Sequence, residues 1–331
     1  MTETAIVAEH LVKRFGPVVA LDGVDFEVPA RTVFGLLGPN GAGKTTAIRI
    51  LTTILRPDSG RAEVLGLDVV RDADEVRYRI GLAGQYAAVD PNLTGRENLR
   101  LTGYLAQLLR IEARARADEL LTRFDLDDAA DRPVKTYSGG MRRRLDVAAA
   151  LVQRPQVVFL DEPTTGLDLP SRNALWAMIR ELVADGTTVL LTTQYLEEAD
   201  RLADRVAVVD GGKVIANDTP AALKAQLGST VIELGMGDTV RAARAGDLLA
   251  SSLDLQPGRD GALLRLSADN ASRVLADVLR LLDDQDLAPV NLAVREPSLD
   301  DVFLALTGRH AEDRAQEDGA AAGAPTARGA A

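Results

Sequence analysis

Short apolar runs and longer stretches of helical periodicity alternate along the first two thirds of the chain. Residues 33–37 and 157–160 are apolar runs, and residues 187–192 form a further run of this kind. Runs of this length are typical of strands that are buried on both faces of a parallel sheet. Between residues 24 and 28, apolar and acidic positions alternate instead, which is the period of a half-buried strand. The pattern predicts an α/β fold in which mostly antiparallel strands over residues 4–37 lead into a parallel sheet.

Residues 91–132 have a helical pattern and predict a helical insertion. Thr94 and Glu97 have the spacing of a capping box, in which two side chains satisfy backbone N–H groups at the start of a helix. The apolar side chains that follow share one face of the predicted helix; they are Leu101, Tyr104, Leu105, Leu108 and Leu109. Alternating Arg and Ala residues at 113–117 favour a helix with a solvated charged face.

The last third of the chain alternates strand and helix patterns and carries no catalytic motif. The predicted elements are strands at 230–234, 262–266 and 289–295 and helices at 239–251, 270–283 and 298–306. Before them, Thr219 and Pro220 favour the start of a helix that ends near Leu227. From Arg309 onward the sequence is rich in Ala and Gly without periodicity, which is typical of disorder. We therefore expect a main domain over residues 4–227, a small C-terminal α+β domain over residues 228–308 and a disordered tail over residues 309–331.

Composition and charge exclude several classes of protein. The 331 residues contain no cysteine and only two histidines, His10 and His310, so we expect no disulfide framework, thiolate metal site or Ser-His-Asp triad. The net charge of −11 is unfavourable for binding nucleic acid, which normally needs a basic patch. No segment resembles a signal peptide or approaches the ~18 apolar residues of a membrane span. We expect a soluble chain that another subunit would have to hold at a membrane.

A glycine-rich loop follows the apolar run at residues 33–37 and precedes a helical pattern at residues 47–55. The loop matches the motif G-x-x-x-x-G-K-[ST] and consists of Gly38, Pro39, Asn40, Gly41, Ala42, Gly43, Lys44, Thr45 and Thr46. A strand, a glycine turn and a helix in this order direct backbone N–H groups toward a polyanion. Lys44 can reach the β- and γ-phosphates of a nucleotide, and Thr45 can offer its hydroxyl to Mg²⁺. The loop predicts a nucleotide-binding site; a glycine turn that binds nothing is the alternative.

A second candidate anion site precedes the helical pattern that begins near residue 139. Ser138 can cap this helix, and Gly139 and Gly140 expose backbone N–H groups at its positive end. A helix cap without a ligand fits the same residues. The arginines at 142–144 could reach a phosphate, although a run of three arginines on a helix is usually a solvated face.

Two carboxylates end the apolar run at residues 157–160. Asp161 and Glu162 lie at the carboxyl edge of the predicted parallel sheet, which is where ligands bind in open α/β sheets. Asp161 can hold Mg²⁺ through water, as the corresponding aspartate does in other phosphate-loop ATPases. Glu162 is the candidate general base that orients or deprotonates an attacking water.

Together these segments resemble the ATPase subunit of an ABC transporter, over residues 4 to about 227. The most specific part of the resemblance is the Ser-Gly-Gly segment just before Leu160-Asp161-Glu162-Pro163-Thr164-Thr165-Gly166-Leu167-Asp168. The resemblance implies a P-loop NTPase fold with an antiparallel β subdomain and a helical subdomain, and it implies ATP and Mg²⁺ as ligands. It also implies that Phe15 stacks on adenine and that Asp168 lies in the loop joining two subunits. For Phe15, a core or strand-end aromatic is the alternative.

The resemblance further implies a mechanism and partners. Two subunits would form a head-to-tail homodimer in which Ser138, Gly139 and Gly140 of one subunit cover the γ-phosphate held by the other. ATP would join the halves and hydrolysis would release them, which would drive an integral membrane permease between two states. The subunit would lie at the cytoplasmic face of the cell membrane, held there by the permease, and would have no nucleic acid partner.

The resemblance also assigns roles to two glutamines. Gln85 matches the glutamine that senses the metal and the attacking water. Gln194 stands where the family usually has a switch histidine, and it can donate a hydrogen bond to the γ-phosphate but cannot become charged near neutral pH. We expect hydrolysis to persist with Lys44, Glu162 and Gln194 as catalytic residues; a strand-end polar side chain is the alternative for Gln194. A second departure is Met141, where the family usually has glutamine.

Several segments are similar to the daunorubicin/doxorubicin-resistance type of drug exporter subunit. They are residues 84–90 with 93–99, residues 192–200, and residues 296–304 in the predicted C-terminal domain. This domain would steady or regulate the dimer, or its last helix would only pack. The similarity implies export of a drug or other hydrophobic compound by a separate permease. A soluble ABC ATPase acting on ribosomes or DNA and a GTP-dependent switch protein are the alternatives; the single set of motifs counts against the first, and the lack of an Asn-Lys-x-Asp motif against the second.

Overall fold

The computed structural model describes residues 3–307, except 86–87, 228–229, 254, 256 and 269–270. The described residues up to Asp218 form one compact unit, and those from Thr219 onward form a second. The predicted disordered tail, residues 309–331, lies outside the described residues, and the boundary expected at residue 227 stays a prediction. Within the described ranges, no helix combines the length and apolar composition that crossing a bilayer requires.

A six-stranded sheet with the order β10-β9-β3-β8-β7-β6 forms the centre of the first unit. Its strands are β3 (Val33–Leu37), β6 (Ile80–Ala83), β7 (Val157–Asp161), β8 (Thr188–Thr193), β9 (Arg205–Asp210) and β10 (Lys213–Asp218). All neighbouring pairs are parallel except the hairpin of β9 and β10. Every residue of β3, β7 and β8 is buried, as expected for strands inside a parallel sheet. The carboxyl ends of five parallel strands therefore meet at one edge of the sheet.

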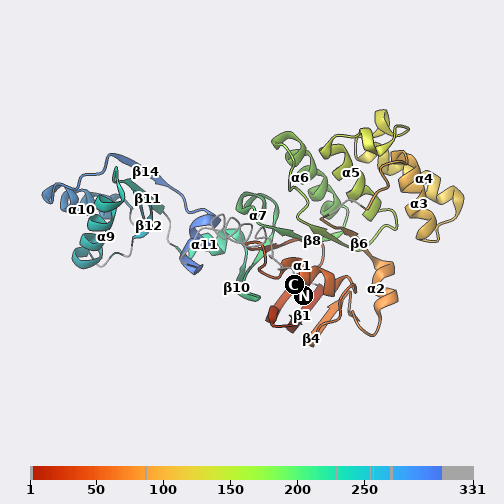
Figure 1. Ribbon diagram of the computed structural model, residues 1–331, viewed down its shortest axis with the longest axis horizontal. Helices are drawn as coiled ribbons and strands as arrows, with labels where there is room; N and C mark the ends of the chain where they lie inside the picture. The colour runs from red at the N-terminus through yellow and green to blue at the C-terminus, as the bar shows by residue number, and fades with distance from the viewer. Residues whose placement is uncertain are drawn as a thin grey trace, which may run out of the picture. The chain divides into compact units, whose positions relative to one another are not determined.

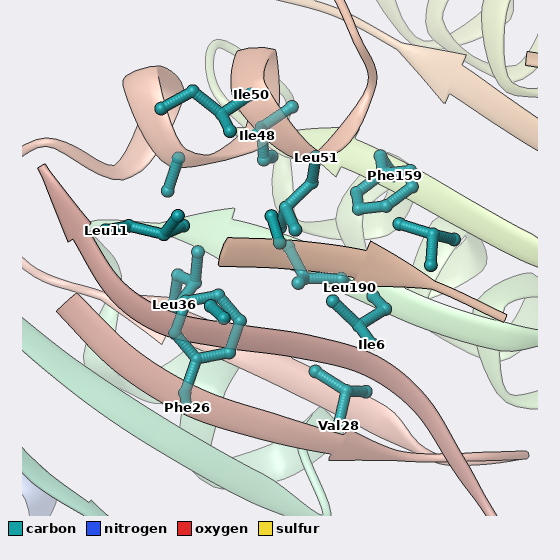
Figure 2. Packing of buried hydrophobic residues seen from close by; sticks show 14 of the residues in the cluster. Ile6, Leu11, Phe26, Val28, Leu36, Ile48, Ile50, Leu51, Phe159 and Leu190 are labelled. Carbon is teal, nitrogen blue, oxygen red and sulfur yellow. The ribbon is translucent and has the colours of Figure 1, made fainter. Parts of the chain in front are cut away.

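A second, antiparallel sheet packs against this one, as expected for the N-terminal region. It has the order β2-β1-β4-β5, with β1 (Thr4–Phe15), β2 (Val18–Pro29), β4 (Ser59–Val64) and β5 (Leu67–Asp68). One buried cluster joins both sheets to helix α1 (Lys44–Leu51). Figure 2 shows Ile48 and Leu51 of α1 on one side of this cluster and Phe26 and Val28 of β2 on the other, with Leu190 of β8 between them. The packing holds the strand and the helix on either side of the glycine-rich loop in a single core.

Six more α-helices follow α1 in the described part of the first unit. They are α2 (Ala73–Arg79), α3 (Gly95–Leu105), α4 (Arg110–Arg123), α5 (Gly139–Ala150), α6 (Leu169–Ala184) and α7 (Leu196–Leu202). In Figure 1, α3 to α6 lie on the side of the parallel sheet away from β1 and β4. Helices α2 and α6 were not predicted from the sequence. Helix α6 buries Leu175, Trp176, Ile179 and Leu182, so its apolar stripe was present in the sequence.

Helix α3 begins as predicted but buries a different face. The capping box of Thr94 and Glu97 is formed in both directions. The buried residues of α3 are Gly95, Asn98, Leu99 and Gly103, whereas the predicted apolar face is largely exposed, with Leu105 76% exposed. The predicted solvated face of α4 is also partly wrong, because Arg116 is buried and donates a hydrogen bond to the Leu151 carbonyl oxygen. The helical insertion thus turns large apolar side chains outward.

The second unit has the α+β pattern predicted for the C-terminal region, with one additional strand. Its elements are α8 (Pro220–Ala225), β11 (Thr230–Gly235), α9 (Thr239–Leu253), β12 (Gly258–Asp260), β13 (Leu263–Ala268), α10 (Ala271–Asp284), β14 (Asn291–Arg295) and α11 (Leu299–Thr307). The strands form an antiparallel sheet with the order β12-β13-β11-β14. A separate hydrophobic core, with Ile232, Leu264 and Leu282 among its members, lies within this unit. Only the short strand β12 was missing from the sequence prediction.

Asp301 anchors the start of α11 to the sheet of the second unit. Its two carboxylate oxygens accept hydrogen bonds from the guanidinium of Arg295 at 2.7 and 2.8 Å, and one of them also accepts from the backbone N–H of Ser298. Burial alone would raise the pKa of Asp301, but the hydrogen bonds from Arg295 and Ser298 outweigh it and lower the pKa to about 2. The carboxylate therefore stabilises the folded unit as long as it is ionised.

We expect Asp301→Asn to lower the free energy of unfolding of the second unit by about 2 kcal/mol at pH 7. Because the folded pKa lies below the unfolded value, this contribution is complete above about pH 5 and declines as the pH falls toward 2, so that about half remains at pH 3. Pulsed hydrogen exchange of α11 during a urea titration, at pH 7 and at pH 3, measures the difference in unfolding free energy between the parent protein and Asp301→Asn. Glu296→Gln, an exposed acid-to-amide change nearby, is the control. A gap of equal size at both pH values would contradict this account of Asp301.

Candidate active site

The glycine-rich loop runs from the end of β3 into α1 and adopts backbone conformations that require glycine. Gly43, the N-cap of α1, has a φ of 108°, and a Cβ there would lie 2.4 Å from the Ala20 carbonyl oxygen. A Cβ on Gly38 would lie 2.1 Å from the carbonyl oxygen of Val209. The backbone N–H of Gly38 donates to the Thr193 carbonyl oxygen at 3.3 Å, which joins the loop to the end of β8. The loop is thus held tightly against its own sheet.

Lys44 is the first residue of α1, and its ammonium group lies inside the loop. Nζ donates hydrogen bonds to the carbonyl oxygens of Gly38 (2.8 Å) and Pro39 (2.9 Å) and lies 3.8 Å from Oε1 of Glu162. Burial lowers the pKa of Lys44, while the charges of Glu162 and Asp161 oppose this effect. A buried ammonium group enclosed by a ring of backbone groups is suited to binding a phosphate.

Asp161, the last residue of β7, is fixed by hydroxyl groups from both sides. Its Oδ1 accepts hydrogen bonds from Oγ1 of Thr45 (3.1 Å) and from Oγ1 of Thr192 (2.6 Å). Thr192 lies opposite Asp161 on the neighbouring strand β8, and its hydroxyl accepts a hydrogen bond from the backbone N–H of Glu162. The carboxylate therefore points toward the start of α1 with little freedom to move.

Glu162 occupies the centre of the site in a strained conformation. Its φ of 47° lies in the left-handed region, which a residue with a Cβ rarely adopts and which costs of order 1–3 kcal/mol. Its Oε2 accepts a hydrogen bond from Nε2 of Gln85 at 3.1 Å, and the Thr165 hydroxyl lies 3.5 Å from the same oxygen. Strain of this kind is typical of residues that a functional site must orient. Gln85 and Glu162, separated by 77 positions in the sequence, thus form one hydrogen-bonded pair.

A cavity of about 280 Å³ brings these groups together. Its lining residues are Ala20, Asn40, Gly41, Gly43, Lys44, Thr45, Thr46, Gln85 and Glu162. The cavity thus joins the end of β6, the end of β7 and the glycine-rich loop. Apart from Ala20, these lining residues were predicted from the sequence to bind phosphate or metal or to act as the general base. The predicted residues Gly38, Pro39, Ala42 and Asp161 are not among the lining residues.

The predicted site residues Gln194 and Phe15 also lie outside the lining of this cavity. Gln194 follows β8 directly, and its Oε1 atom is buried without a hydrogen-bond partner among the described residues. This oxygen is an acceptor, so it can receive a hydrogen bond but cannot donate one. Phe15 ends β1 with 47% of its surface exposed, and the Lys13 ammonium lies 5.7 Å from the centre of its ring. Phe15 is therefore not a core aromatic, but it is a strand-end aromatic, so this part of its alternative interpretation stands.

The Ser-Gly-Gly segment forms the tip of α5 and does not line the cavity. Ser138 caps the helix, since its Oγ accepts a hydrogen bond from the Met141 backbone N–H at 3.2 Å. A Cβ on Gly140 would meet the Ser171 hydroxyl oxygen at 2.5 Å, so this glycine is required by packing against α6. A Cβ on Gly139, the first helical residue, would have no heavy atom of the described chain within 4 Å. Packing within the described chain therefore does not account for a glycine at position 139.

Two residues that organise the site were not predicted from the sequence. Thr192 orients Asp161 and Glu162, and nothing in its own run distinguishes it from an ordinary strand residue. Arg143 donates hydrogen bonds within the site and is only 10% exposed, so the arginines at 142–144 are not a uniformly solvated face. The signal that could have found Arg143 is the acid three positions later, Asp146, on a helix face that is otherwise apolar.

Comparisons with known proteins agree with this geometry. The family model described as ABC transporter matches residues 21–165. The daunorubicin resistance ATP-binding protein DrrA2 of Streptomyces coeruleorubidus is 54% identical, covering 96% of this chain and 99% of that protein. The Nod factor export ATP-binding protein I of Ralstonia nicotianae is 39% identical, covering 92% of this chain and 94% of that protein. A solved dimeric ATP-binding cassette in a post-hydrolysis state, bound to ADP and Pi, has a TM-score of 0.59 at 25% identity, covering 65% of this chain and 98% of that one.

The fold, the glycine-rich loop and the Asp-Glu strand, together with these similarities, define a class of protein: the chain belongs to the ABC transporter family, as one of its ATP-binding cassettes. More particularly, it resembles the daunorubicin/doxorubicin-resistance type of ATP-binding subunit over almost its whole length. The family and the fold class predicted from the sequence are both confirmed.

Proposed function

We propose that this chain is an ATP-hydrolysing subunit that powers a separate membrane permease for the export of a drug or other hydrophobic compound. The observation that carries the proposal is the single cavity lined by the glycine-rich loop, Gln85 and Glu162. A buried ammonium group, an oriented carboxylate and a strained glutamate around one cavity are the groups that hydrolysis of a nucleoside triphosphate needs.

Each residue has a distinct role in this proposal. Residues 38–46 bind the phosphates through backbone N–H groups, and Lys44 neutralises the β- and γ-phosphates. Glu162 accepts a proton from the attacking water. Gln85 helps to orient this water, because its hydrogen bond to Glu162 fixes the carboxylate that binds the water. Gln194, which directly follows β8, donates a hydrogen bond from its side-chain NH2 group to the γ-phosphate. The exposed ring of Phe15 stacks on the adenine.

Thr45 and Asp161, with Gln85 nearby, are the residues that would hold Mg²⁺. Thr45 would bind the ion directly through its hydroxyl oxygen, and Asp161 would hold it through a bound water. The Thr45 hydroxyl donates a hydrogen bond to Oδ1 of Asp161 at 3.1 Å, so the two groups lie together at the start of α1. Bound there, the ion would neutralise negative charge on the phosphates.

The proposal includes a head-to-tail homodimer in which the tip of α5 covers the nucleotide of the other subunit. The open surroundings of Gly139 support it, because a glycine is needed at an open helix tip if a ligand or another chain approaches closely. The similar cassette with ADP and Pi is a dimer, which also supports the proposal. In this arrangement, ATP would draw two copies together and hydrolysis would separate them.

The relatives support export as the direction of transport and leave the cargo open. Their names refer to daunorubicin or doxorubicin resistance and to Nod factor export, which are chemically different compounds. Because an ATP-binding subunit acts through its permease in this proposal, the permease determines which compound is moved. We propose the cytoplasmic face of the cell membrane as the location of the subunit.

The exposed apolar side chains of the helical insertion are the proposed contact with the permease. This apolar patch consists of Leu101, Tyr104 and Leu105 of α3, Leu109 and Ile111, and all five are exposed. Large apolar side chains that gather on a surface are typical of protein interfaces. Leu105 and Ile111 are 76% and 82% exposed, so they are accessible to a partner.

We expect Leu105→Asp to abolish copurification with the permease and to leave the basal ATPase rate of the isolated subunit unchanged. A charge at the centre of an apolar contact costs several kcal/mol of binding energy, whereas at an exposed position it changes stability by less than about 0.5 kcal/mol. Val240→Asp, at an exposed position of α9, is the control and should copurify normally. Undiminished copurification of the Leu105→Asp subunit would show that the patch is not the contact.

A further inference from the structure

Arg143 of α5 connects three segments of the active site through its guanidinium group. Nε donates a hydrogen bond to the carbonyl oxygen of Pro163 at 2.9 Å. The two terminal nitrogens donate to the carbonyl oxygens of Gly84 (2.6 Å) and Asp161 (3.1 Å). All three acceptors are backbone oxygens, so the arginine fixes the course of the main chain.

The residues held in this way directly flank the two side chains at the centre of the site. Gly84 immediately precedes Gln85. Asp161 and Pro163 lie immediately before and after Glu162, whose backbone is strained. Arg143 therefore fixes the backbone next to Gln85 and Glu162, although none of these three hydrogen bonds is to the side chain of either residue.

Asp146, one turn further along α5, completes the connection. It is almost fully buried, accepts a hydrogen bond from Arg143 at 2.9 Å and accepts another from the backbone N–H of Ala88 at 2.7 Å. Burial lowers the pKa of Arg143 and raises that of Asp146, and the opposite charge of each partner counteracts the shift of the other. Buried ion pairs contribute little net stability, but they define geometry well. The pair thus holds the chain on both sides of Gln85.

The same helix carries the tip that is proposed to cover the nucleotide of the other subunit. Arg143 is four residues beyond Gly139, which is about 6 Å along a helix with a rise of 1.5 Å per residue. Hydrogen bonds within α5 keep this distance constant. A displacement of the tip therefore also moves the backbone of Arg143 and the guanidinium group attached to it. One short helical segment therefore joins the tip to the backbone around Gln85 and Glu162.

We propose that Arg143 is a positioning residue that couples the two ATP sites of the dimer. When the tip of α5 engages the γ-phosphate bound by the other subunit, Arg143 aligns Gln85 and Glu162 of its own chain for hydrolysis. The inference rests on the proposed head-to-tail dimer. It adds a route by which one site senses occupation of the other.

The geometry of the contact requires arginine. Four hydrogen bonds to three carbonyl oxygens and one carboxylate oxygen use the planar fork of a guanidinium group. Lysine keeps the charge and can still pair with Asp146, but its single nitrogen cannot span the three backbone oxygens. Arg143→Lys thus removes the positioning function and keeps the buried acid paired.

The test measures ATP hydrolysis by the full-length subunit as a function of ATP concentration. We expect a Hill coefficient of about 2 for the parent protein, the number of coupled sites. For Arg143→Lys, we expect the coefficient to fall to about 1 and kcat to fall between about 10- and 100-fold, as misplacement of catalytic groups by about 1 Å would cause. Arg114→Lys, the same change at an exposed position of α4, should match the parent in both quantities.

The outcomes separate this inference from the proposed function. Sedimentation in Mg-ATP of the parent carrying Glu162→Gln shows whether the dimer forms; a single chain there would overturn the dimer and the inference with it. If the dimer forms but the parent protein has a Hill coefficient of about 1, the inference is wrong while the proposed function stands. The same holds if the Arg143→Lys subunit has the same Hill coefficient as the parent protein. If Arg143→Lys lowers the thermal unfolding midpoint, Arg143→Gln combined with Asp146→Asn replaces it, because the two changes together leave no buried charge without a partner. Failure of both proteins to fold would mean that the residue is structural.

Discussion

Replacing Glu162 with glutamine should lower ATP turnover by about 10²- to 10⁴-fold, which is the loss expected when a general base is removed. Glutamine has nearly the same shape and can keep the hydrogen bond from Gln85, but it cannot accept a proton from water near neutral pH. The backbone strain at this position stays the same, because neither residue relieves a φ of 47°. Nucleotide affinity should therefore persist while hydrolysis stops.

Phosphate release at saturating Mg-ATP measures the turnover, and equilibrium dialysis measures the affinity. Glu181→Gln, an exposed acid on α6, is the control and should behave like the parent protein. Normal turnover of the Glu162→Gln subunit would show that another group serves as the base.

Replacing Gly139 with aspartate should lower turnover by about 100-fold or more while the fold is unharmed, because the change places a negative charge where the γ-phosphate of the other subunit is proposed to lie. The new side chain has room within its own chain, since a Cβ there meets no described heavy atom within 4 Å. An acid in the first turn of a helix is also favourable, by about 0.3–1 kcal/mol. Stability and activity should thus change in opposite directions.

Thermal unfolding and phosphate release, measured on the same preparation, test this separation. Gly139→Asn has the same size without the charge and should lose less activity than Gly139→Asp. Equal losses for both variants would indicate a steric effect, and full activity of Gly139→Asp would mean that no anion meets the tip of α5.

The parts of the site that the sequence predicted are those defined by local chemistry. The glycine-rich loop is recognisable because a strand, a glycine turn and a helix must follow one another without interruption. Asp161 and Glu162 could be placed because they end a buried strand, and parallel strands of one sheet bring their carboxyl ends together. Thr94 and Ser138 were predicted as helix caps from their own neighbours, and the structure confirms both.

The parts that the sequence did not predict depend on tertiary packing or on another chain. Arg143 belongs to a run of three arginines, and only the packing of α5 against two other loops distinguishes it from its neighbours. The apolar residues of α3 suggested an inward face, but Leu105 and its neighbours are exposed, because this helix packs inward through small and polar residues such as Gly103 and Asn98. Helix α2 buries only Val76, so it has no apolar periodicity to detect. Helix α6 has such a stripe, and Asp168, which the family resemblance assigned to a loop joining two subunits, is the N-cap of this helix.

The measurement that tests the central claim most directly is the mass of the Glu162→Gln subunit in solution, by sedimentation, with and without Mg-ATP. We expect a single chain of 35.3 kDa without nucleotide and a particle of twice that mass with it, because each α5 tip then meets the triphosphate bound by the other copy. A particle of 35.3 kDa at saturating Mg-ATP would contradict the account, since the active site would then act within one chain.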